Sequence, residues 1–447
     1  SFQGFCSGRI VACRGCGFRV CLPAMHTGTP RRSGWRRLLR WAVCAALLVV
    51  ALVFLRAWHA FRDRNPGYTL GLDIDAAPSV AAPRPLRVGF GRLPINPNLS
   101  NPKRPVWLAG FSQNRAATAL HDSLWAHACV LEDGDTRLGV VSLDAIGFFH
   151  DDVIEVRRRL DPAWRLDYTV VCATHNHSTP DLMGLWGPHP LKSGVDAQYR
   201  EQVITAVAHA LGQAVEALEP ARVAFHEIPL PTDGLVHDSR KPIVFDADLR
   251  VMHFTQPDTG ATLGTVIGWG NHPETVWGKN TEITSDFCGY LREALEKGVI
   301  LDGHRHAEGL GGIHVYVTGA VGGLMTTSPS VTVRDPYLDR EFQEPSHDKA
   351  RALGYQLASR LLPVLRAPDA AAARHAPISI RARTVELPIE NGVFLLAPVL
   401  GILDRGHVRW KTLRTEIALI TVGDASIACL PGEVYPEIVN GGIERAP

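Results

Sequence analysis

One uninterrupted apolar run, residues 41–55, fits a lipid bilayer, whereas the chain that follows it must fold in water. Five arginines lie within the ten residues before the run, and Arg56 closes it. With its apolar flanks the run approaches the roughly 20 residues that cross a bilayer as a helix. No small-x-small cleavage pattern follows, which favours an uncleaved transmembrane anchor over a signal peptide. The arginines predict a cytoplasmic amino terminus, so that everything after residue 55 lies outside the cytoplasm, in the periplasm or the extracellular space.

The sequence divides into four segments. Residues 1–37 are expected to be a basic leader, disordered or translated from upstream sequence, and residues 38–58 the transmembrane or signal anchor. A Pro/Ala-rich stretch indicates that residues 59–85 are a linker. Residues 86–447 remain as one folded domain, and a content of 46% apolar and 20% charged residues is ordinary for such a domain. A net charge of +1 gives no reason to expect a nucleic-acid partner, and no protein partner can be inferred.

Strand and helix patterns are mixed along the folded domain. The clearest helix pattern is an apolar stripe through Val203, Val207, Leu211 and Leu218. Strands are expected at 126–131, 137–143, 168–173, 222–228, 249–254, 263–269, 314–318, 378–387 and in a hairpin over 416–430, and helices at 151–160, 198–218, 286–297 and 346–362. This mixture predicts an α/β fold of layered, mixed β-sheets flanked by helices.

Reactive side chains follow three of the expected strands. His175 and His177 come after the strand at 168–173, and on an extended backbone they would point to the same side. One of them can then hold a metal while the other acts on what the metal activates. His272 follows the strand at 263–269, and Glu433 follows the hairpin. Because ligands gather at the carboxyl ends of strands in open α/β sheets, two imidazoles and a carboxylate from distant segments predict a zinc site with an open position.

A series of short motifs from about Val88 to the chain end resembles the neutral/alkaline, non-lysosomal ceramidase family in its amino-terminal catalytic domain. In order, they are Val88–Gly91, Leu108–Phe111, His121–Leu124, Val141–Asp144, Thr174–Pro180, Asn271–Pro273, Ile283–Leu291 and Pro431–Glu433. Each motif alone is weak, but their order along the chain is specific. The resemblance identifies a divergent, bacterial-type member.

The resemblance implies a function and a set of site residues. The function is zinc-dependent hydrolysis of the amide of a ceramide or a related N-acyl lipid, through metal-activated water, to a fatty acid and an amine. His175, His272 and Glu433 would be the zinc ligands, and His177 the catalytic residue that contacts the substrate or its tetrahedral intermediate. Ser178 and Arg240 are the predicted substrate-binding residues, although Arg240 is equally well explained as a surface charge.

Two family features have no counterpart here. The serine near the Gly-rich loop, which has a catalytic role in the family, falls at about Met325, with Thr326 and Thr327 beside it. The fourth zinc ligand of the family is a tyrosine well beyond the glutamate, whereas Tyr435 lies only two residues after Glu433. The domain is therefore expected to be truncated at its carboxy terminus.

Two other functions stay open at this point. The segments Gly270–Glu274 and Gly303–His306 resemble ligand motifs of two-metal phosphoesterases, but the Asp-x-His and Gly-Asp-x-x-Asp motifs of such enzymes do not precede Asn271. A non-catalytic envelope protein that keeps the fold for binding would explain the missing serine and the glycine at position 323.

Overall fold

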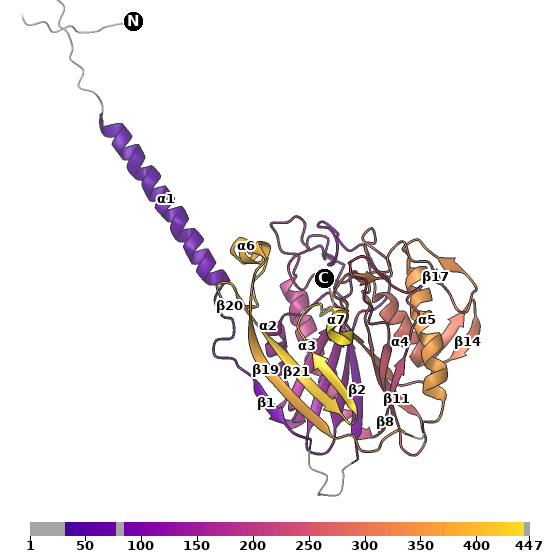
Figure 1. The fold of residues 1–447 in the computed structure, drawn as a ribbon. Helices are drawn as coiled ribbons and strands as arrows, with labels where there is room; N and C mark the ends of the chain where they lie inside the picture. Colours follow the sequence, from indigo (N-terminus) through magenta and orange to yellow (C-terminus); the bar gives the residue numbers. More distant parts are fainter. Residues whose placement is uncertain (1–31, 77–84, 370, 442–447) are drawn as a thin grey trace, which may run out of the picture. The chain divides into compact units, whose positions relative to one another are not determined.

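The computed structural model describes residues 32–76, 85–369 and 371–441 (Figure 1). The chain separates into two compact units, residues 1–54 and 55–447. Most of the predicted leader lies outside the described residues. Helix α1 (Arg32–Ala60) already begins within the last residues of that segment, so the prediction of disorder is wrong for residues 32–37.

Within the described residues, α1 is the one helix long and apolar enough to cross a membrane. The most apolar 18-residue window of the stretch Gly34–Ala60 has a mean hydropathy of 2.6 and contains no buried residue. Because a signal sequence passes the same test, length and composition establish an apolar amino-terminal helix and no more. The predicted anchor at residues 38–58 lies entirely within it.

Three sheets organise the second unit. The first has the order β6-β5-β4-β2-β7, the second β15-β11-β10-β8, and the third β1-β19-β21-β20 with β22 paired to β21. Their bounds are β6 Tyr168–Ala173, β5 Arg137–Leu143, β4 Trp125–Glu132, β2 Arg87–Pro94, β7 Glu219–Pro220, β15 Ile313–Thr318, β11 Thr262–Trp269, β10 Leu249–Thr255, β8 Arg222–Ile228, β1 Gly71–Ile74, β19 Ile378–Pro388, β21 Thr412–Val422, β20 His407–Arg409 and β22 Ala425–Cys429. The pairs β5–β6 and β11–β15 are parallel and the other pairs in these sheets are antiparallel, which confirms mixed sheets.

In the described part of this unit, short strand pairs and six α-helices complete the fold. The pairs are β3 (Ala119–Leu120) with β12 (Glu282–Ile283), β9 (His237–Asp238) with β16 (Met325–Thr326), β13 (Gly298–Leu301) with β14 (His304–Glu308), and β17 (Val333–Arg334) with β18 (Glu341–Phe342). The helices are α2 His150–Arg158, α3 Ala197–Glu216, α4 Asp286–Lys297, α5 His347–Arg366, α6 Gly392–Leu400 and α7 Pro436–Asn440. The predicted helices correspond to α2, α3, α4 and α5 to within a few residues.

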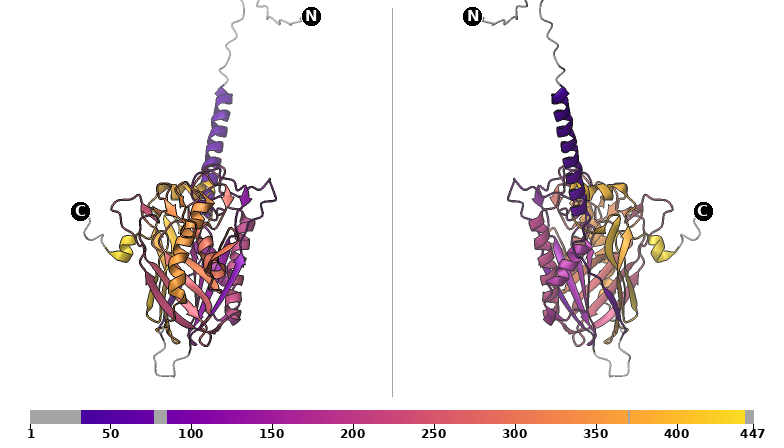
Figure 2. Two further views of the ribbon diagram at one scale, coloured as in Figure 1. Left: turned by 90° about the vertical axis from the view of Figure 1, so that its right-hand side faces the viewer. Right: turned by 90° about the vertical axis from the view of Figure 1, so that its left-hand side faces the viewer.

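The core is layered as the sequence predicts. One apolar cluster lies between α3 and the first sheet, a second between α4, α5 and the second sheet, and a third where the three sheets face one another. Figure 2 shows α5, in orange, in front of the strands in its left view. The α/β fold with helices on the outside is thereby confirmed.

Strand β2 shows how the sequence sets this layering. Gly89 and Gly91 alternate with Val88 and Phe90, which are buried in the cluster between the sheets. A Cβ atom on either glycine would lie 2.8 Å from a backbone nitrogen of the segment formed by α3 and its end. The two glycines therefore let α3 pack directly on the strand.

The prediction of a linker over residues 59–85 is wrong for residues 60–76. Asn65 is buried and its side-chain amide donates to Asp151 at 2.7 Å, and β1 pairs with β19 as the edge of the third sheet. The Pro/Ala-rich composition begins only after β1. The residues before it contact α2 and β19, and such tertiary contacts cannot be inferred from composition.

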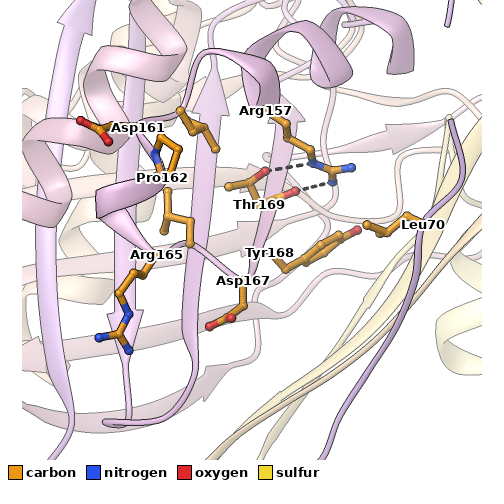
Figure 3. Close-up of a pocket in the computed structure, with 10 residues that line it drawn as sticks. Leu70, Arg157, Asp161, Pro162, Arg165, Asp167, Tyr168 and Thr169 are labelled. Carbon is orange, nitrogen blue, oxygen red and sulfur yellow. Dashed lines mark hydrogen bonds between the residues drawn. The ribbon is translucent and has the colours of Figure 1, made fainter.

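Tyr168 and Thr169, at the start of β6, line a shallow surface pocket (Figure 3). Arg157 of α2 donates to the side chain and the carbonyl of Thr169, at 3.1 and 2.8 Å. His175 and His177 follow the opposite end of the same strand. The pocket is therefore separate from the predicted site.

Beside this pocket, Glu416 of β21 accepts two hydrogen bonds from Arg157, at 2.7 and 2.8 Å, and lies 2.8 Å from Nε2 of His150. Burial alone would raise the pKa of Glu416, but His150 and Arg157 outweigh burial and lower it to about 2. Because the folded-state pKa is below the unfolded value, the stability from Glu416 is complete above about pH 4.5 and is lost as the pH falls toward 2. We expect Glu416→Gln to remove a contribution on the order of 3 kcal/mol at pH 7.

Urea unfolding of the full chain in detergent at pH 7 and near pH 2 measures this contribution. The difference in unfolding free energy between wild type and Glu416→Gln should shrink at the lower pH. An equal difference in unfolding free energy at both pH values would contradict stabilisation by the charge of Glu416.

Candidate metal centre

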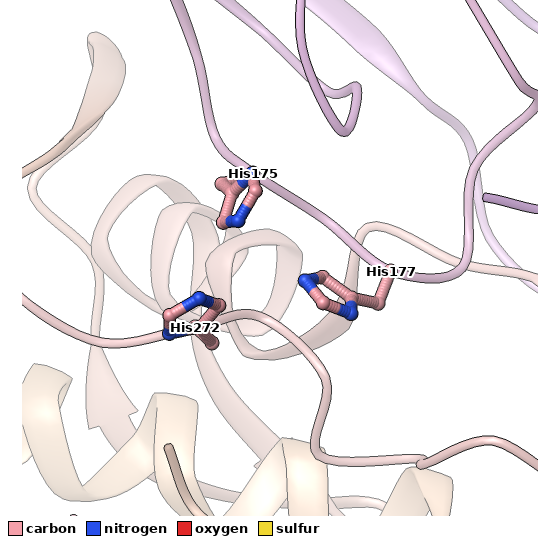
Figure 4. Close-up of side chains that lie close together, drawn as sticks. All are labelled: His175, His177 and His272. Carbon is pink, nitrogen blue, oxygen red and sulfur yellow. The ribbon is translucent and has the colours of Figure 1, made fainter. Parts of the chain in front are cut away.

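Four predicted site residues converge at the carboxyl ends of strands from all three sheets. His175 and His177 follow β6 of the first sheet, His272 follows β11 of the second, and Glu433 follows β22 of the third. Figure 4 shows the three imidazole rings turned toward a common point. Their ring centroids lie 4.9 to 5.5 Å apart, and one ring nitrogen of each lies within 4.8 Å of the others.

The backbone achieves this differently from the expected extended strand end. His175 has a φ of 64°, so the chain turns directly after β6. The rings of His175 and His177 end up almost perpendicular, at 87°. The turn at His175, and not the alternation of side chains along an extended strand, brings the two rings to one site.

Backbone carbonyls fix the orientation of two of the rings. Nδ1 of His175 lies 2.7 Å from the carbonyl oxygen of Ile146, and Nδ1 of His272 lies 2.6 Å from that of Met325. A carbonyl oxygen only accepts, so both Nδ1 atoms carry the proton and both Nε2 atoms face the centre. Met325 is fully buried, so its carbonyl, and not a side chain, contributes to the site.

Glu433 bridges the two Nε2 atoms. Its carboxylate oxygens lie 3.3 Å from Nε2 of His175 and 3.4 Å from Nε2 of His272. Two ligands about 2.0–2.2 Å from one tetrahedral ion are separated by a similar distance, so this donor set fits zinc. The two rings hold the pKa of Glu433 well below its usual range. Burial lowers the pKa of His272, but Glu433, Glu274 and the Met325 carbonyl outweigh burial and raise it, which marks a centre that favours positive charge.

His177 is held by different neighbours. Oε2 of Glu274 lies 3.0 Å from its Nδ1, Phe111 contacts the ring edge-on at a centroid distance of 5.1 Å, and Arg115 donates to its carbonyl at 2.7 Å. Burial lowers the pKa of the His177 ring, and Glu274 partly offsets this effect. Nε2 of His177 is buried and has no hydrogen-bond partner among the described residues. This nitrogen is free to exchange a proton with a bound molecule.

Sequence reasoning missed Glu274 and Gly110. Glu274 stands two residues after His272 in the Gly-Asn-His-Pro-Glu segment, which was the available signal. Gly110 has a φ of 102°, and a Cβ atom there would lie 2.6 Å from Nδ1 of His177. The glycine therefore leaves the room that the ring occupies.

We expect Gly110→Ala to lower turnover about 10²-fold by displacing His177, because a shift of about 1 Å in a reacting group has this effect. Gly303→Ala is the matched control, since Gly303 also has a positive φ of 77° but no neighbour within 4 Å of the added Cβ. Both variants should lose about 1 kcal/mol of stability from the positive φ, and Gly110→Ala should lose about 1–3 kcal/mol more because its Cβ overlaps the buried His177 ring. Equal turnover in the two variants would contradict the packing role of Gly110.

The two predicted substrate-binding residues lie in different settings. Ser178 is fully buried, and its hydroxyl accepts a hydrogen bond from Asn280 at 3.2 Å, so the structure does not support a substrate contact for it. Arg240 pairs with Glu437 at 2.5 Å and stacks over the ring of Tyr435 at 4.8 Å. It lies beside the segment that carries Glu433 but is not a free surface charge.

A second histidine cluster is less suited to a metal. One ligand atom each of His121, Glu282 and His347 lies within 4.8 Å of the others. The two rings, however, stack with a centroid distance of 3.5 Å and an angle of 11°, so their lone pairs run parallel. His304 and His306, from the phosphoesterase-like segment, lie on the exposed strand β14 and belong to neither cluster found in the described part of the chain.

No model of a known protein family matches the chain. Two solved structures are similar to it. A neutral ceramidase from Pseudomonas aeruginosa is 17% identical, with a TM-score of 0.60 over 78% of this chain and 62% of that chain. A ceramidase complexed with C2 is also 17% identical, with a TM-score of 0.59 over 78% of this chain and 64% of that chain. The chain thus matches less than two thirds of the length of each. At this identity the likeness establishes the architecture, and this chain has the fold of the neutral ceramidases.

Proposed function

We propose that this chain is a zinc-dependent amide hydrolase that cleaves a ceramide or a related N-acyl lipid to a fatty acid and an amine. The observation that carries the proposal is the convergence of His175, His272 and Glu433 on one point, with both Nε2 atoms turned inward. The ceramidase fold of the chain supports the substrate class.

In this proposal His175, His272 and Glu433 hold the ion. A bound zinc ion supplies a Lewis acid for the amide carbonyl and brings the pKa of water near neutrality, to about 7. The three side chains would hold the ion at the carboxyl ends of the strands.

His177 carries the proton transfer. Its lowered pKa keeps the ring neutral near pH 7, with Glu274 facing Nδ1, so that Nε2 accepts a proton. The same nitrogen then returns the proton to the leaving amine, which an amide requires because an unprotonated amine anion is a poor leaving group. No other acid has to enter the site for this step.

Apolar and charged neighbours favour an amphipathic substrate. Phe111 lies edge-on to His177 and 5.3 Å from Trp277, and both aromatic side chains are half-buried beside the site. They offer a wall for an acyl chain. Arg240, held by Glu437, remains a candidate for contact with the polar part of the substrate.

The proposal includes a location. Helix α1 is the anchor, the arginines before residue 41 keep its amino terminus in the cytoplasm, and the metal centre faces the extracytoplasmic side. An anchored enzyme stays close to a substrate that is itself dissolved in a bilayer.

The test is release of fatty acid from an N-acylsphingosine by the full-length protein in detergent. We expect turnover, its loss after removal of metal with a chelator, and its return on addition of zinc. Hydrolysis of a phosphomonoester with two bound ions per chain would favour the phosphoesterase alternative. Bound zinc without turnover of any N-acyl lipid would favour the non-catalytic alternative.

A further inference from the structure

An apolar surface patch lies on α6 and the turn before β21. It consists of Val393, Leu396, Leu400 and Trp410, whose exposed fractions are 63%, 64%, 51% and 55%. Beneath it, Ala397, Ile402 and Leu403 form a small core of their own. The patch is thus a folded feature that keeps large apolar side chains in contact with solvent.

The chain directly after the apolar run contacts this patch. Arg56 donates from Nε to the carbonyl of Val399 at 3.0 Å, and the ring of Phe61 meets that of Trp410 edge-on at 4.6 Å. Arg64 donates to the carbonyl of Asp404 at 2.9 Å. These contacts join the last turns of α1, and the residues directly after it, to both ends of the patch.

Exposed cations lie beside the aromatic part of the patch. Arg62 and Lys411 are exposed beside Phe61 and Trp410, whereas Arg409 is paired with Glu386 at 2.6 Å. Tryptophan next to lysine or arginine is typical of the headgroup region, where the indole lies at the boundary and the cations meet lipid phosphates.

The patch is also connected to the metal centre. Arg405 donates to the carbonyl of Leu182 at 2.8 Å, and Leu185 packs on the core under α6. In the same loop, Trp186 donates to the carbonyl of Phe111 at 3.0 Å, and Phe111 contacts His177. One continuous set of contacts therefore leads from α6 to the ring that the mechanism uses.

We propose that Val393, Leu396, Leu400 and Trp410 rest in the headgroup boundary of the bilayer that holds α1, and that this contact sets the metal centre at the membrane surface. This inference takes one element from the proposed function, which is the role of α1 as a membrane anchor. It adds a second, specific contact with lipid and predicts that the substrate enters from the bilayer.

Trp410 itself reports the contact. The full chain is reconstituted into vesicles of phosphatidylcholine with a minority of phosphatidylglycerol, with and without brominated acyl chains. We expect bromine to quench a component of the tryptophan emission that is missing in Trp410→Phe. Unchanged bromolipid quenching in Trp410→Phe would overturn the proposal.

A second pair of variants keeps the test independent of Trp410→Phe. Val393→Asp/Leu396→Asp should lower the Trp410 component of quenching severalfold while the chain still sediments with the vesicles through α1. Ile300→Asp is the control, because Ile300 is similarly exposed, at 52%, on β13 outside the patch, and it should change nothing. Equal quenching in the double variant and wild type would also overturn the proposal.

Other outcomes separate this inference from the proposed function. A chain that does not sediment with vesicles would overturn the anchor and the patch together. The chain could instead sediment with vesicles while bromolipid does not quench Trp410 and acrylamide does not reach it. This result would assign the patch to contact with a second copy of the chain, and it would overturn only the lipid contact of the patch. Fatty-acid release in detergent is unaffected by either result.

Discussion

Replacing His272 by alanine is expected to lower kcat/KM for an N-acyl lipid by about 10³-fold or more, since a metal Lewis acid contributes several kcal/mol to the transition state. His272 is the more buried of the two rings that Glu433 bridges, at a relative exposure of 3%, and the Met325 carbonyl fixes it. Without it, one imidazole and one carboxylate remain to hold the ion. The measurement is steady-state hydrolysis of N-acylsphingosine by the purified full chain.

His347→Ala is the matched control. This residue is also a histidine beside a glutamate, 2.9 Å from Glu282, but it lies in the stacked pair with His121. We expect its activity to stay close to that of wild type. A comparable loss in both variants would mean that the second cluster contributes to the reaction, contrary to the assignment made above.

Replacing Asp144 by alanine is expected to lower the free energy of unfolding by about 3–5 kcal/mol, the usual cost of leaving one partner of a buried ion pair uncompensated. Asp144 directly follows β5 and is fully buried, and it accepts hydrogen bonds from both terminal nitrogens of Arg292 of α4, at 2.9 and 2.7 Å, and from the backbone of Trp125. Urea unfolding of the full chain in detergent measures the loss.

An exposed pair on the same helix provides the control. Glu293 and Lys297 of α4 lie 3.0 Å apart, with side chains 58% and 63% exposed, so Glu293→Ala should cost no more than about 0.5 kcal/mol. Asp144→Leu combined with Arg292→Met should recover most of the loss, because it leaves no buried charge unpaired. Failure of the double variant to recover would point to a contribution other than the ion pair.

The layered fold was predictable because its strands carry strong local signals. The runs at β5, β6 and β11 are short, apolar and bounded by turn residues, and each predicted strand lies within a residue or two of the observed one. Strand β1 was missed, because its four residues have no pattern until they pair with β19. Helix α6 was missed because its nine residues are apolar on all sides and include Pro398, so that they show no amphipathic period.

The sequence points to the residues of the candidate metal centre, but not to the groups that orient them. His175, His272 and Glu433 stand out as reactive groups directly after strands. The carbonyls of Ile146 and Met325, which orient the rings, carry no side-chain signal at all. The carboxylate of Asp286 is fully buried and accepts from the backbone of Phe287 and Val276. Such partners depend on tertiary contacts that spacing does not encode.

The zinc content of His177→Ala, measured beside that of His175→Ala and wild type, tests the central claim most directly. We expect wild type and His177→Ala each to bind one zinc ion per chain, while the turnover of His177→Ala falls by about 10²–10⁴-fold, as for loss of a general acid–base group. His175→Ala should lose both zinc and turnover. Loss of zinc from His177→Ala to the same extent as from His175→Ala would make His177 a ligand, and full zinc in His175→Ala would remove the metal centre from these residues.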